Sequence, residues 1–284
     1  MSIVVTGANG HLGRHVVEQL LEKVPADQVT AVVRTPEKGA DLAERGVKIA
    51  VADYNTPDTF DALFAAGDKV LLISGSEVGN DRVGQHKVVI NPAKAAGVAL
   101  LAYTSAPGSL TAALADDHRG TEKVLLESGL PYVLLRNGWY HENYTENLAP
   151  VLQYNAVTHA AGEGRVSSAA RADYAAAAVA VLTGEGHENK TYELGGDVAW
   201  SFAEYAAELS RQSGKEIANN AVSAEDLVGI LTGAGLPEPL PAILAGVDTS
   251  IEKGELAIGS GDLSRLTGRP TTPIAESIGA ALKG

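Results

Sequence analysis

The sequence of 284 residues contains no cysteine. This absence excludes disulfide bonds, thiolate ligands for a metal ion and a cysteine nucleophile. Positive charge is also scarce, because 22 Lys and Arg residues stand against 35 Asp and Glu residues, which gives a net charge of −13 at pH 7. The basic residues form no cluster, whereas proteins that bind nucleic acids neutralise phosphates with grouped Lys and Arg. We therefore expect no nucleic-acid partner.

Long apolar runs are missing as well. No run reaches the roughly 18 apolar residues that a membrane-spanning helix needs. The N-terminus has neither the basic segment nor the cleavage pattern of a signal peptide, so we expect no membrane partner and a cytoplasmic location. Hydrophobic residues nevertheless make up 45% of the chain, which is enough for the core of one large α/β domain with a smaller appended lobe.

The first residues carry a distinctive pattern. A short β-branched run at 2–6 is followed by glycines spaced three residues apart and then by an amphipathic stretch at 14–24. This order predicts a strand, a glycine turn and a helix whose unpaired N–H groups bind the pyrophosphate of a dinucleotide. A glycine turn without a ligand is the alternative, since the spacing G-x-x-G-x-x-G matches the common fingerprint only in part. The turn residues expected to contact the cofactor are Gly7, Asn9, Gly10, His11, Leu12 and Gly13.

Strand-like and helix-like segments alternate over the first half of the chain. Apolar runs lie at 2–6, 28–33, 47–52, 69–74, 98–104 and 132–136, with helical patterns between them at 14–24, 36–45, 57–66, 82–96 and 113–128. Continuous apolar strands separated by helices predict an α/β fold with a Rossmann-type, doubly wound parallel sheet, covered by helices on both faces and ordered 3-2-1-4-5-6. The helical segments end at glycines, as left-handed C-terminal caps do, namely Gly46, Gly67, Gly97 and Gly129.

The alternation stops after Asn137. An alanine-rich helical pattern at 169–183 and a short apolar segment at 191–194 are expected to pack back on the sheet. From Trp200 onward, helical patterns with Pro and Gly breaks dominate, at 202–213, 224–234 and 273–282. We therefore expect a nucleotide-binding Rossmann domain over 1–150, with 169–195 packing back on it, and a smaller, mostly helical C-terminal lobe over 196–284 that covers the substrate.

The residues at the strand ends favour NADP over NAD. An NAD site places an acidic residue about 20 positions after the glycines, on the ribose 2′-hydroxyl, but here the second strand ends at Arg34. A guanidinium suits the 2′-phosphate, so we expect NADPH (NADP) as the cofactor, with a solvated arginine as the alternative. Asp53 can accept a hydrogen bond from the adenine amino group or serve as a turn residue. Further residues expected beside the cofactor at strand ends are Tyr54, Ser74, Gly75, Ser76, Thr104 and Asn137.

Several common active sites are absent. None of the nine tyrosines is followed by Lys four positions later, so the Tyr/Lys pair that protonates a carbonyl in short-chain dehydrogenases is missing. No G-x-S-x-G motif of an α/β-hydrolase occurs. His11 and His15 have the spacing of two metal ligands on a helix, but no third ligand accompanies them, so we expect no metal site.

Five stretches together define a resemblance, namely residues 6–13, 52–55, 72–78, 135–140 and 142–144. They resemble the NmrA-like group of atypical short-chain dehydrogenases. Within it the chain is most similar to the bacterial NADPH:quinone oxidoreductases of the second type, and next to the triphenylmethane dye reductases. The resemblance runs over essentially the whole chain. It implies flavin-free transfer of hydride from NADPH directly to a flat, electron-poor acceptor such as a quinone, which does not need the missing Tyr/Lys pair.

This chemistry requires donor and acceptor to be held together, and one or two hydrogen-bond donors for the charge that develops on the quinone oxygen. His118 is the first catalytic candidate, because isoflavone-reductase-like relatives place their catalytic lysine there and because histidine can donate or supply a proton near neutral pH. Tyr140 and Asn143 are expected to contact the acceptor, and Trp139 and Tyr144 to form an aromatic wall. For His118 the alternative is an exposed histidine on a helix. For the polar and aromatic residues after the sixth strand, the alternative is packing between the two lobes.

Two functions remain open at this point. One is an NADPH-dependent quinone reductase, with dye or nitro-compound reduction as a variant. The other is a non-catalytic NADP-binding redox sensor of the NmrA type, which signals to a protein partner. The polar and aromatic residues after Asn137 favour the reductase, since a sensor needs no acceptor site. The sequence leaves the oligomeric state open, with a homodimer as one alternative.

Overall fold

The chain forms two compact units that interleave along the sequence. The computed structural model describes residues 2–77, 80–146 and 148–283. The first unit, here called the sheet unit, comprises Met1–Ala106, Asp117–Asn137 and Arg171–Tyr192. The second unit comprises Pro107–Asp116, Gly138–Ala170 and Glu193–Gly284. The expected domain ranges differ from these units, because residues 138–150 lie in the second unit. A division into domains at 1–150 and 196–284 stays a prediction.

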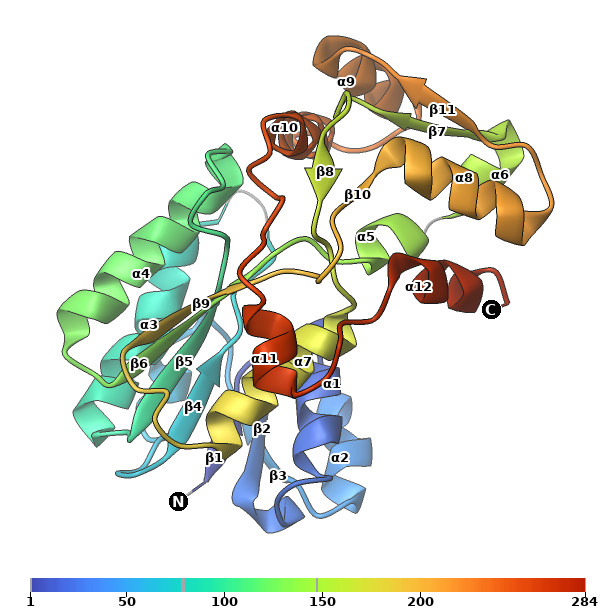
Figure 1. The fold of residues 1–284 in the computed structure, drawn as a ribbon. Coiled ribbons are helices and arrows are strands. Elements are labelled where there is room, and N and C mark those ends of the chain that lie inside the picture. Colours follow the sequence, from blue (N-terminus) through green and yellow to red (C-terminus); the bar gives the residue numbers. More distant parts are fainter. Residues whose placement is uncertain (1, 78–79, 147, 284) are drawn as a thin grey trace. The chain divides into compact units, whose positions relative to one another are not determined.

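Seven strands form the sheet of the sheet unit in the order β3-β2-β1-β4-β5-β6-β9 (Figure 1). The six strands from β3 to β6 pair in parallel, so that Val4, for example, pairs with Thr30 on one side and Val70 on the other. This confirms the α/β class and the order 3-2-1-4-5-6, and it adds β9 beside β6. The strands are β1 (Ile3–Val5), β2 (Val29–Val33), β3 (Lys48–Val51), β4 (Lys69–Leu72), β5 (Leu100–Ser105), β6 (Tyr132–Asn137) and β9 (Lys190–Leu194).

Helices cover the sheet on both faces, as largely apolar parallel strands require (Figure 1). Helices α3 (Arg82–Ala96) and α4 (Asp116–Ser128) contribute Ile90 and Leu125 to one core cluster, together with strand residues such as Val70. Helices α1 (His11–Leu20) and α7 (Arg171–Thr183) pack against each other, and Gln19 Nε2 donates to the carbonyl of Ala172 at 3.0 Å.

Glycine ends four of the segments that connect these elements, as predicted. Gly46, Gly67, Gly97 and Gly129 have φ values of 87°, 84°, 70° and 76°. This is the left-handed region, which glycine adopts without the steric cost of a Cβ atom. The left-handed conformation is therefore confirmed at all four glycines, but Gly67 follows a turn and does not cap a helix.

Two predicted helices are shorter than expected. The segment 36–45 divides into a 3-10 turn (Pro36–Gly39) and the short helix α2 (Ala40–Glu44), and the segment 57–66 holds only a 3-10 turn (Pro57–Phe60). Further along, the carboxylate of Asp68 accepts hydrogen bonds from Ser2 N (2.7 Å) and Ala65 N (3.0 Å). These bonds hold the chain in a turn where a helix was predicted, and such a contact with the N-terminus is invisible in local periodicity.

The second unit is mostly helical and contains four short strands that were not predicted. Strand β7 (Ala156–His159) pairs in parallel with β11 (Ala218–Ala221), and β8 (Arg165–Val166) pairs antiparallel with β10 (Trp200–Ser201). Strands of two to four residues are too short to show a period of two. The helices are α5 (Glu142–Thr145), α6 (Leu148–Tyr154), α8 (Phe202–Ser213), α9 (Ala224–Gly233), α10 (Leu240–Glu252), α11 (Asp262–Thr267) and α12 (Ile274–Ala281).

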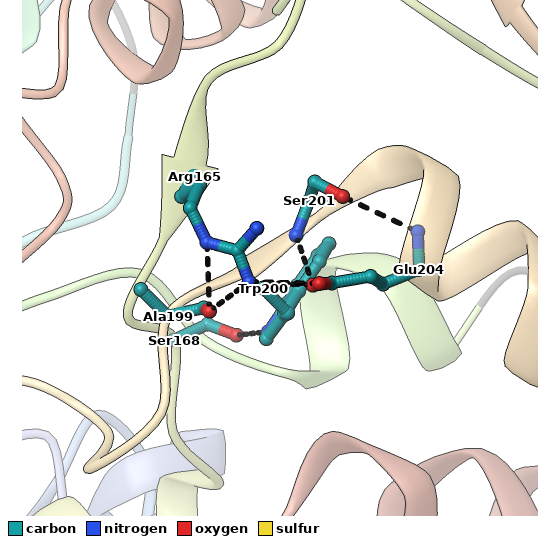
Figure 2. A network of polar contacts seen from close by, with 6 residues as sticks. All are labelled: Arg165, Ser168, Ala199, Trp200, Ser201 and Glu204. Carbon is teal, nitrogen blue, oxygen red and sulfur yellow. Dashed lines mark hydrogen bonds and ion pairs between the residues drawn. The ribbon is translucent and has the colours of Figure 1, made fainter.

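Polar contacts join β8, β10 and the start of α8 (Figure 2). Ser201 and Glu204 form a capping box, in which the Ser201 hydroxyl accepts from Glu204 N at 3.3 Å and the Glu204 carboxylate accepts from Ser201 N at 2.9 Å. Arg165 donates to both carboxylate oxygens of Glu204, at 2.9 and 2.7 Å, and to the carbonyl of Ala199. The two strands and the helix are thereby fixed to one another within the second unit.

Candidate functional site

The turn after β1 is held by backbone hydrogen bonds to both neighbouring strands. Thr6 N donates to Leu71 O at 3.0 Å, and Ala8 N donates to Val32 O at 3.1 Å. Gly7 has a φ of 61°, and its carbonyl accepts from Gly10 N at 2.9 Å. The turn is therefore fixed before the helix begins.

Helix α1 approaches this turn so closely that only glycine fits at position 13. A Cβ atom on Gly13 would lie 2.2 Å from the carbonyl oxygen of Gly7 and 2.8 Å from Cα of Ala8. Gly10 is the N-cap, no side chain caps the helix, and no acidic residue lies in its first turn. An uncapped helix N-terminus presents N–H groups and a partial positive charge, which suit a phosphate. Of the remaining turn residues, Asn9 and His11 are exposed and Leu12 is buried.

Arg14 braces the same turn and was not expected from the sequence. Its guanidinium forms an ion pair with Asp41 at 2.5 Å and donates to the amide oxygen of Asn9 at 3.0 Å. Because the Asn9 oxygen is engaged as an acceptor, the amide nitrogen of Asn9 is the end left to donate to a ligand.

Arg34 lies where the sequence placed it, at the end of β2, and it forms an ion pair with Glu77. The Arg34 Nη1 to Glu77 Oε1 distance is 3.1 Å, and the two side chains are 57% and 47% exposed. Exposed pairs of this kind contribute about 0–1 kcal/mol, so a doubly charged 2′-phosphate can replace Glu77 at little cost. The arginine is thus paired at the protein surface, and it remains accessible to an anion.

At the end of β3, two candidate residues form contacts within the protein. Asp53 Oδ1 accepts from Asn55 N at 2.9 Å, which is the turn role that was the alternative to an adenine contact. The hydroxyl of Tyr54 lies 2.6 Å from Thr6 Oγ1 and donates to Ile73 O at 2.7 Å. Burial raises the pKa of Tyr54 well above its usual range. Tyr54 therefore ties three strand ends together as a neutral phenol.

Two buried side chains hold the loop after β4 by accepting hydrogen bonds from its backbone N–H groups. Ser74 N donates to the hydroxyl of Thr104 at 2.9 Å, and Gly75 N donates to Nε2 of His86 at 3.0 Å. Thr104 and His86 are 3% and 0% exposed, whereas Ser76 is exposed. Thr104 thus supports the loop through its hydroxyl. His86 was not among the predicted residues, and its only sequence signal was a histidine on the apolar face of a helix.

His118 is partly buried in the sheet unit and not the exposed helix residue that was the alternative. Its Nδ1 lies 2.9 Å from the hydroxyl of the fully buried Tyr103. Burial lowers the pKa of His118 to about 4, the positive charge of Arg82 acts in the same direction, and the negative charge of Glu122 opposes it. Of the two roles expected for His118, hydrogen-bond donor and proton source, a ring that is neutral near neutral pH favours the donor, and its catalytic role stays a prediction. His118 can act there as a neutral hydrogen-bond donor.

An ionic cluster that the sequence analysis missed lies at the ends of β5 and β6. Arg136 donates to both carboxylate oxygens of Glu122, at 2.9 and 2.7 Å, and the hydroxyl of Ser105 donates to the same carboxylate at 2.6 Å. Glu122 is 7% exposed, and a buried carboxylate needs such a bidentate partner. The cluster fixes α4 against the end of β6, next to the buried candidate Asn137.

The remaining candidates lie in the second unit. Tyr140 forms a bridge with Ala169 and is half-buried, and Asn143 is exposed near the start of α5. The ring of Tyr144 contacts the ring of Trp200 at a centroid distance of 5.0 Å. The Trp200 indole donates to Ser168 Oγ at 2.9 Å, as Figure 2 shows. Tyr144 thus belongs to an aromatic cluster within its own unit. The structure places His118 in the sheet unit and both Tyr140 and Asn143 in the second unit, while every predicted cofactor residue belongs to the sheet unit.

Over the described ranges, no helix is long and apolar enough to cross a membrane. Within the same ranges, no group of three or more His, Asp or Glu side chains could hold a metal ion.

Comparisons with known proteins agree with this geometry. A model of the family described as NAD(P)H-binding matches residues 7–185, and the chain therefore belongs to this family. The chain is 47% identical to quinone oxidoreductase 2 of Escherichia coli (strain K12) over 278 residues, which covers 97% of each protein. The resemblance to the NmrA-like atypical short-chain dehydrogenases is confirmed.

Two solved structures have the same fold over the whole chain. One is the NADPH-dependent quinone oxidoreductase of Escherichia coli complexed with NADPH, with 46% identity, a TM-score of 0.95, and coverage of 99% of this chain and 100% of that one. The other is the triphenylmethane reductase of Citrobacter sp. complexed with NADP(H), with 41% identity, a TM-score of 0.94, and the same coverage.

The contact at Gly13 generates a test of the turn. Replacing Gly13→Ala places a methyl group 2.2 Å from a carbonyl oxygen, so α1 must shift away from the turn. We expect a loss of about 1–3 kcal/mol in the free energy of unfolding, measured with urea, and at least tenfold weaker NADPH binding, measured by nicotinamide fluorescence. Gly229→Ala is the matched control, because its Cβ would meet nothing within 4 Å on a helix. Equal stability and affinity in Gly13→Ala and the native protein would contradict the assignment.

The two buried histidines predict how stability depends on pH. Burial lowers the pKa of His86 to about 3 and that of His118 to about 4, below the unfolded value near 6.5. Their contribution is therefore complete above pH 6.5 and is lost as the pH falls toward the folded values. We expect each histidine to reduce the free energy of unfolding by about 1 kcal/mol between pH 7 and pH 5.5. In His118→Gln the loss of unfolding free energy between pH 7 and pH 5.5 should be smaller by about 1 kcal/mol. The same loss as in the native protein, measured by urea titrations at both pH values, would refute this prediction.

Proposed function

We propose that this protein is an NADPH-dependent quinone reductase, which transfers hydride directly to a flat acceptor without a flavin. The observation that carries the proposal is the contact between Gly13 and Gly7, which sets an uncapped helix N-terminus against the end of β1. The relatives that share this fold over the whole chain are named as quinone and dye reductases, and two of them were solved with NADPH or NADP(H). The same turn supports cofactor binding here.

The cofactor fits the residues present in the sheet unit. The backbone of Gly7, Gly10 and Gly13, with Asn9, His11 and Leu12, would hold the pyrophosphate. Arg34 would exchange its surface partner Glu77 for the 2′-phosphate, which favours NADPH over NADH. Asp53, Ser74, Gly75, Ser76 and Asn137 would line the remaining length of the cofactor, with Tyr54 and Thr104 supporting them.

When bound, NADPH would supply a hydride, that is, one hydrogen with two electrons, and leave as NADP⁺, while one proton from solvent would complete the hydroquinone. The protein's own residues have to orient the acceptor and stabilise charge on its oxygen. His118 does this as a neutral imidazole, because Tyr103 can donate to Nδ1 and leave the hydrogen on Nε2 for the acceptor. Tyr140 and Asn143 stay the sequence-based candidates for contacting the acceptor.

The proposal is tested by following NADPH oxidation with benzoquinones and naphthoquinones, with and without added flavin mononucleotide. We expect saturable turnover that does not require flavin, lowered about 10- to 100-fold in kcat by His118→Ala, since one oriented hydrogen-bond donor is lost. Tyr140→Phe should lower kcat/KM for the quinone. Tight NADPH binding without reduction of any quinone, dye or nitro compound would instead support the redox sensor.

Cofactor choice has its own test. Arg34→Ala should weaken NADPH binding by about 10- to 100-fold, because a charge-assisted contact to phosphate is lost, and should leave NADH binding almost unchanged. Glu77→Gln is the matched variant, since it removes the competing carboxylate and should keep or raise affinity for NADPH. If Arg34→Ala weakens the binding of NADPH and of NADH equally, the arginine does not bind the 2′-phosphate.

A further inference from the structure

A buried histidine connects the loop after β4 to the second turn of α4. His86 is 0% exposed, lies on α3, and contacts both elements through its two ring nitrogens. Its Nε2 lies 3.0 Å from Gly75 N, and its Nδ1 lies 2.8 Å from Thr121 Oγ1. The Thr121 hydroxyl in turn donates to the carbonyl of Asp117 at 2.9 Å. These contacts lie wholly within the sheet unit.

In each hydrogen bond of this series, only one of the two groups can be the donor. The backbone N–H of Gly75 is a donor, so Nε2 of His86 must be the unprotonated acceptor. The hydroxyl hydrogen of Thr121 goes to the carbonyl of Asp117, which can only accept, so Thr121 Oγ1 must accept from Nδ1–H of His86. His86 is therefore neutral, with its hydrogen on Nδ1. Burial lowers the pKa of His86 to about 3, and the positive charge of Arg82, joined by that of His118 once His118 is protonated in acid, acts in the same direction, so the ring is neutral at working pH.

The two ends of this series of hydrogen bonds, Gly75 and Asp117, both belong to the candidate site or adjoin it. Gly75 belongs to the loop that we place beside the cofactor, and Asp117 directly precedes His118. Between them, the ring of His86 lies 5.2 Å from the ring of Tyr103, whose hydroxyl contacts His118 Nδ1. A displacement of His86 would thus act on the loop, on the start of α4 and on the partner of His118 together.

We propose that His86 is a positioning residue, which acts through Thr121 to fix His118 relative to the loop at Gly75. The inference rests on the proposed function, since it assigns a purpose to the placement of His118. It differs from the role of a satisfied core histidine in a measurable consequence. The Thr121 side chain bonds to His86 and also to Tyr103, the partner of His118, so breaking the series at Thr121 is expected to change the surroundings of His118 without unfolding the protein.

The experiment uses Thr121→Val, which keeps the shape of the side chain but removes its hydroxyl. Thr121→Ser restores the hydroxyl. Thr183→Val is the control, because Thr183 donates to Val179 O at 2.8 Å in the same helical geometry without a histidine partner. Imidazole nitrogen NMR of the native protein, with His86 and His118 assigned by single substitutions, should show hydrogen on Nδ1 and not on Nε2 of His86.

The variants should separate cleanly. In Thr121→Val the signals of both His86 and His118 should shift, kcat for the quinone should fall about tenfold, and the Kd for NADPH should stay within about threefold. Thr121→Ser should resemble the native protein, and Thr183→Val should change neither signal. An Nε2–H form of His86, an unmoved His118 signal in Thr121→Val, or an equal loss of kcat in Thr183→Val would overturn the proposal. If the native protein reduces no acceptor, the proposed function fails, while the NMR signals of His118 still decide whether His86 positions it.

Discussion

The close approach of α1 to the end of β1 is the constraint on which the rest of the site depends. Because Gly13 has no Cβ atom, the helix can lie against the carbonyl of Gly7, and its uncapped N-terminus faces the end of the strand. Hydrogen bonds from Thr6 and Ala8 to the two adjacent strands hold this turn in register with the sheet. An anion-binding position is thereby fixed at the centre of the sheet, where the strand order reverses direction along the chain.

Around that turn, the buried polar side chains form hydrogen bonds with backbone groups of the protein. Tyr54, Thr104 and His86 each bond to the loop after β4 or to the strand end beneath it. A rigid backbone edge suits a reaction in which a reactive acceptor needs correct placement more than activation. Tyr54 and Thr104, which the sequence placed beside the cofactor, form such bonds within the protein, and their contact with the cofactor stays a prediction.

Buried charge sets the chemistry of the histidines. Arg82 is 6% exposed and lies close enough to His86 and His118 to disfavour a second positive charge on either ring. Glu122 opposes this effect, but it is itself bound by Arg136. The result is a group of neutral hydrogen-bond donors and acceptors, suited to holding an oxygen atom in place and unsuited to storing a proton at pH 7.

The sequence by itself determined the sheet order, the glycine caps and the nucleotide-binding turn, because each depends on local periodicity or on a glycine within a few positions. Only the tertiary structure decided the role of Tyr54, whose hydroxyl contacts Thr6, 48 positions earlier, and Ile73, 19 positions later. It also decided the neutral state of His118, which depends on burial and on Arg82. The tautomer of His86 likewise follows from contacts with two other elements. Residues that act on neighbours in sequence leave a readable pattern, whereas residues that act on neighbours in space become visible only when the strands and helices are packed.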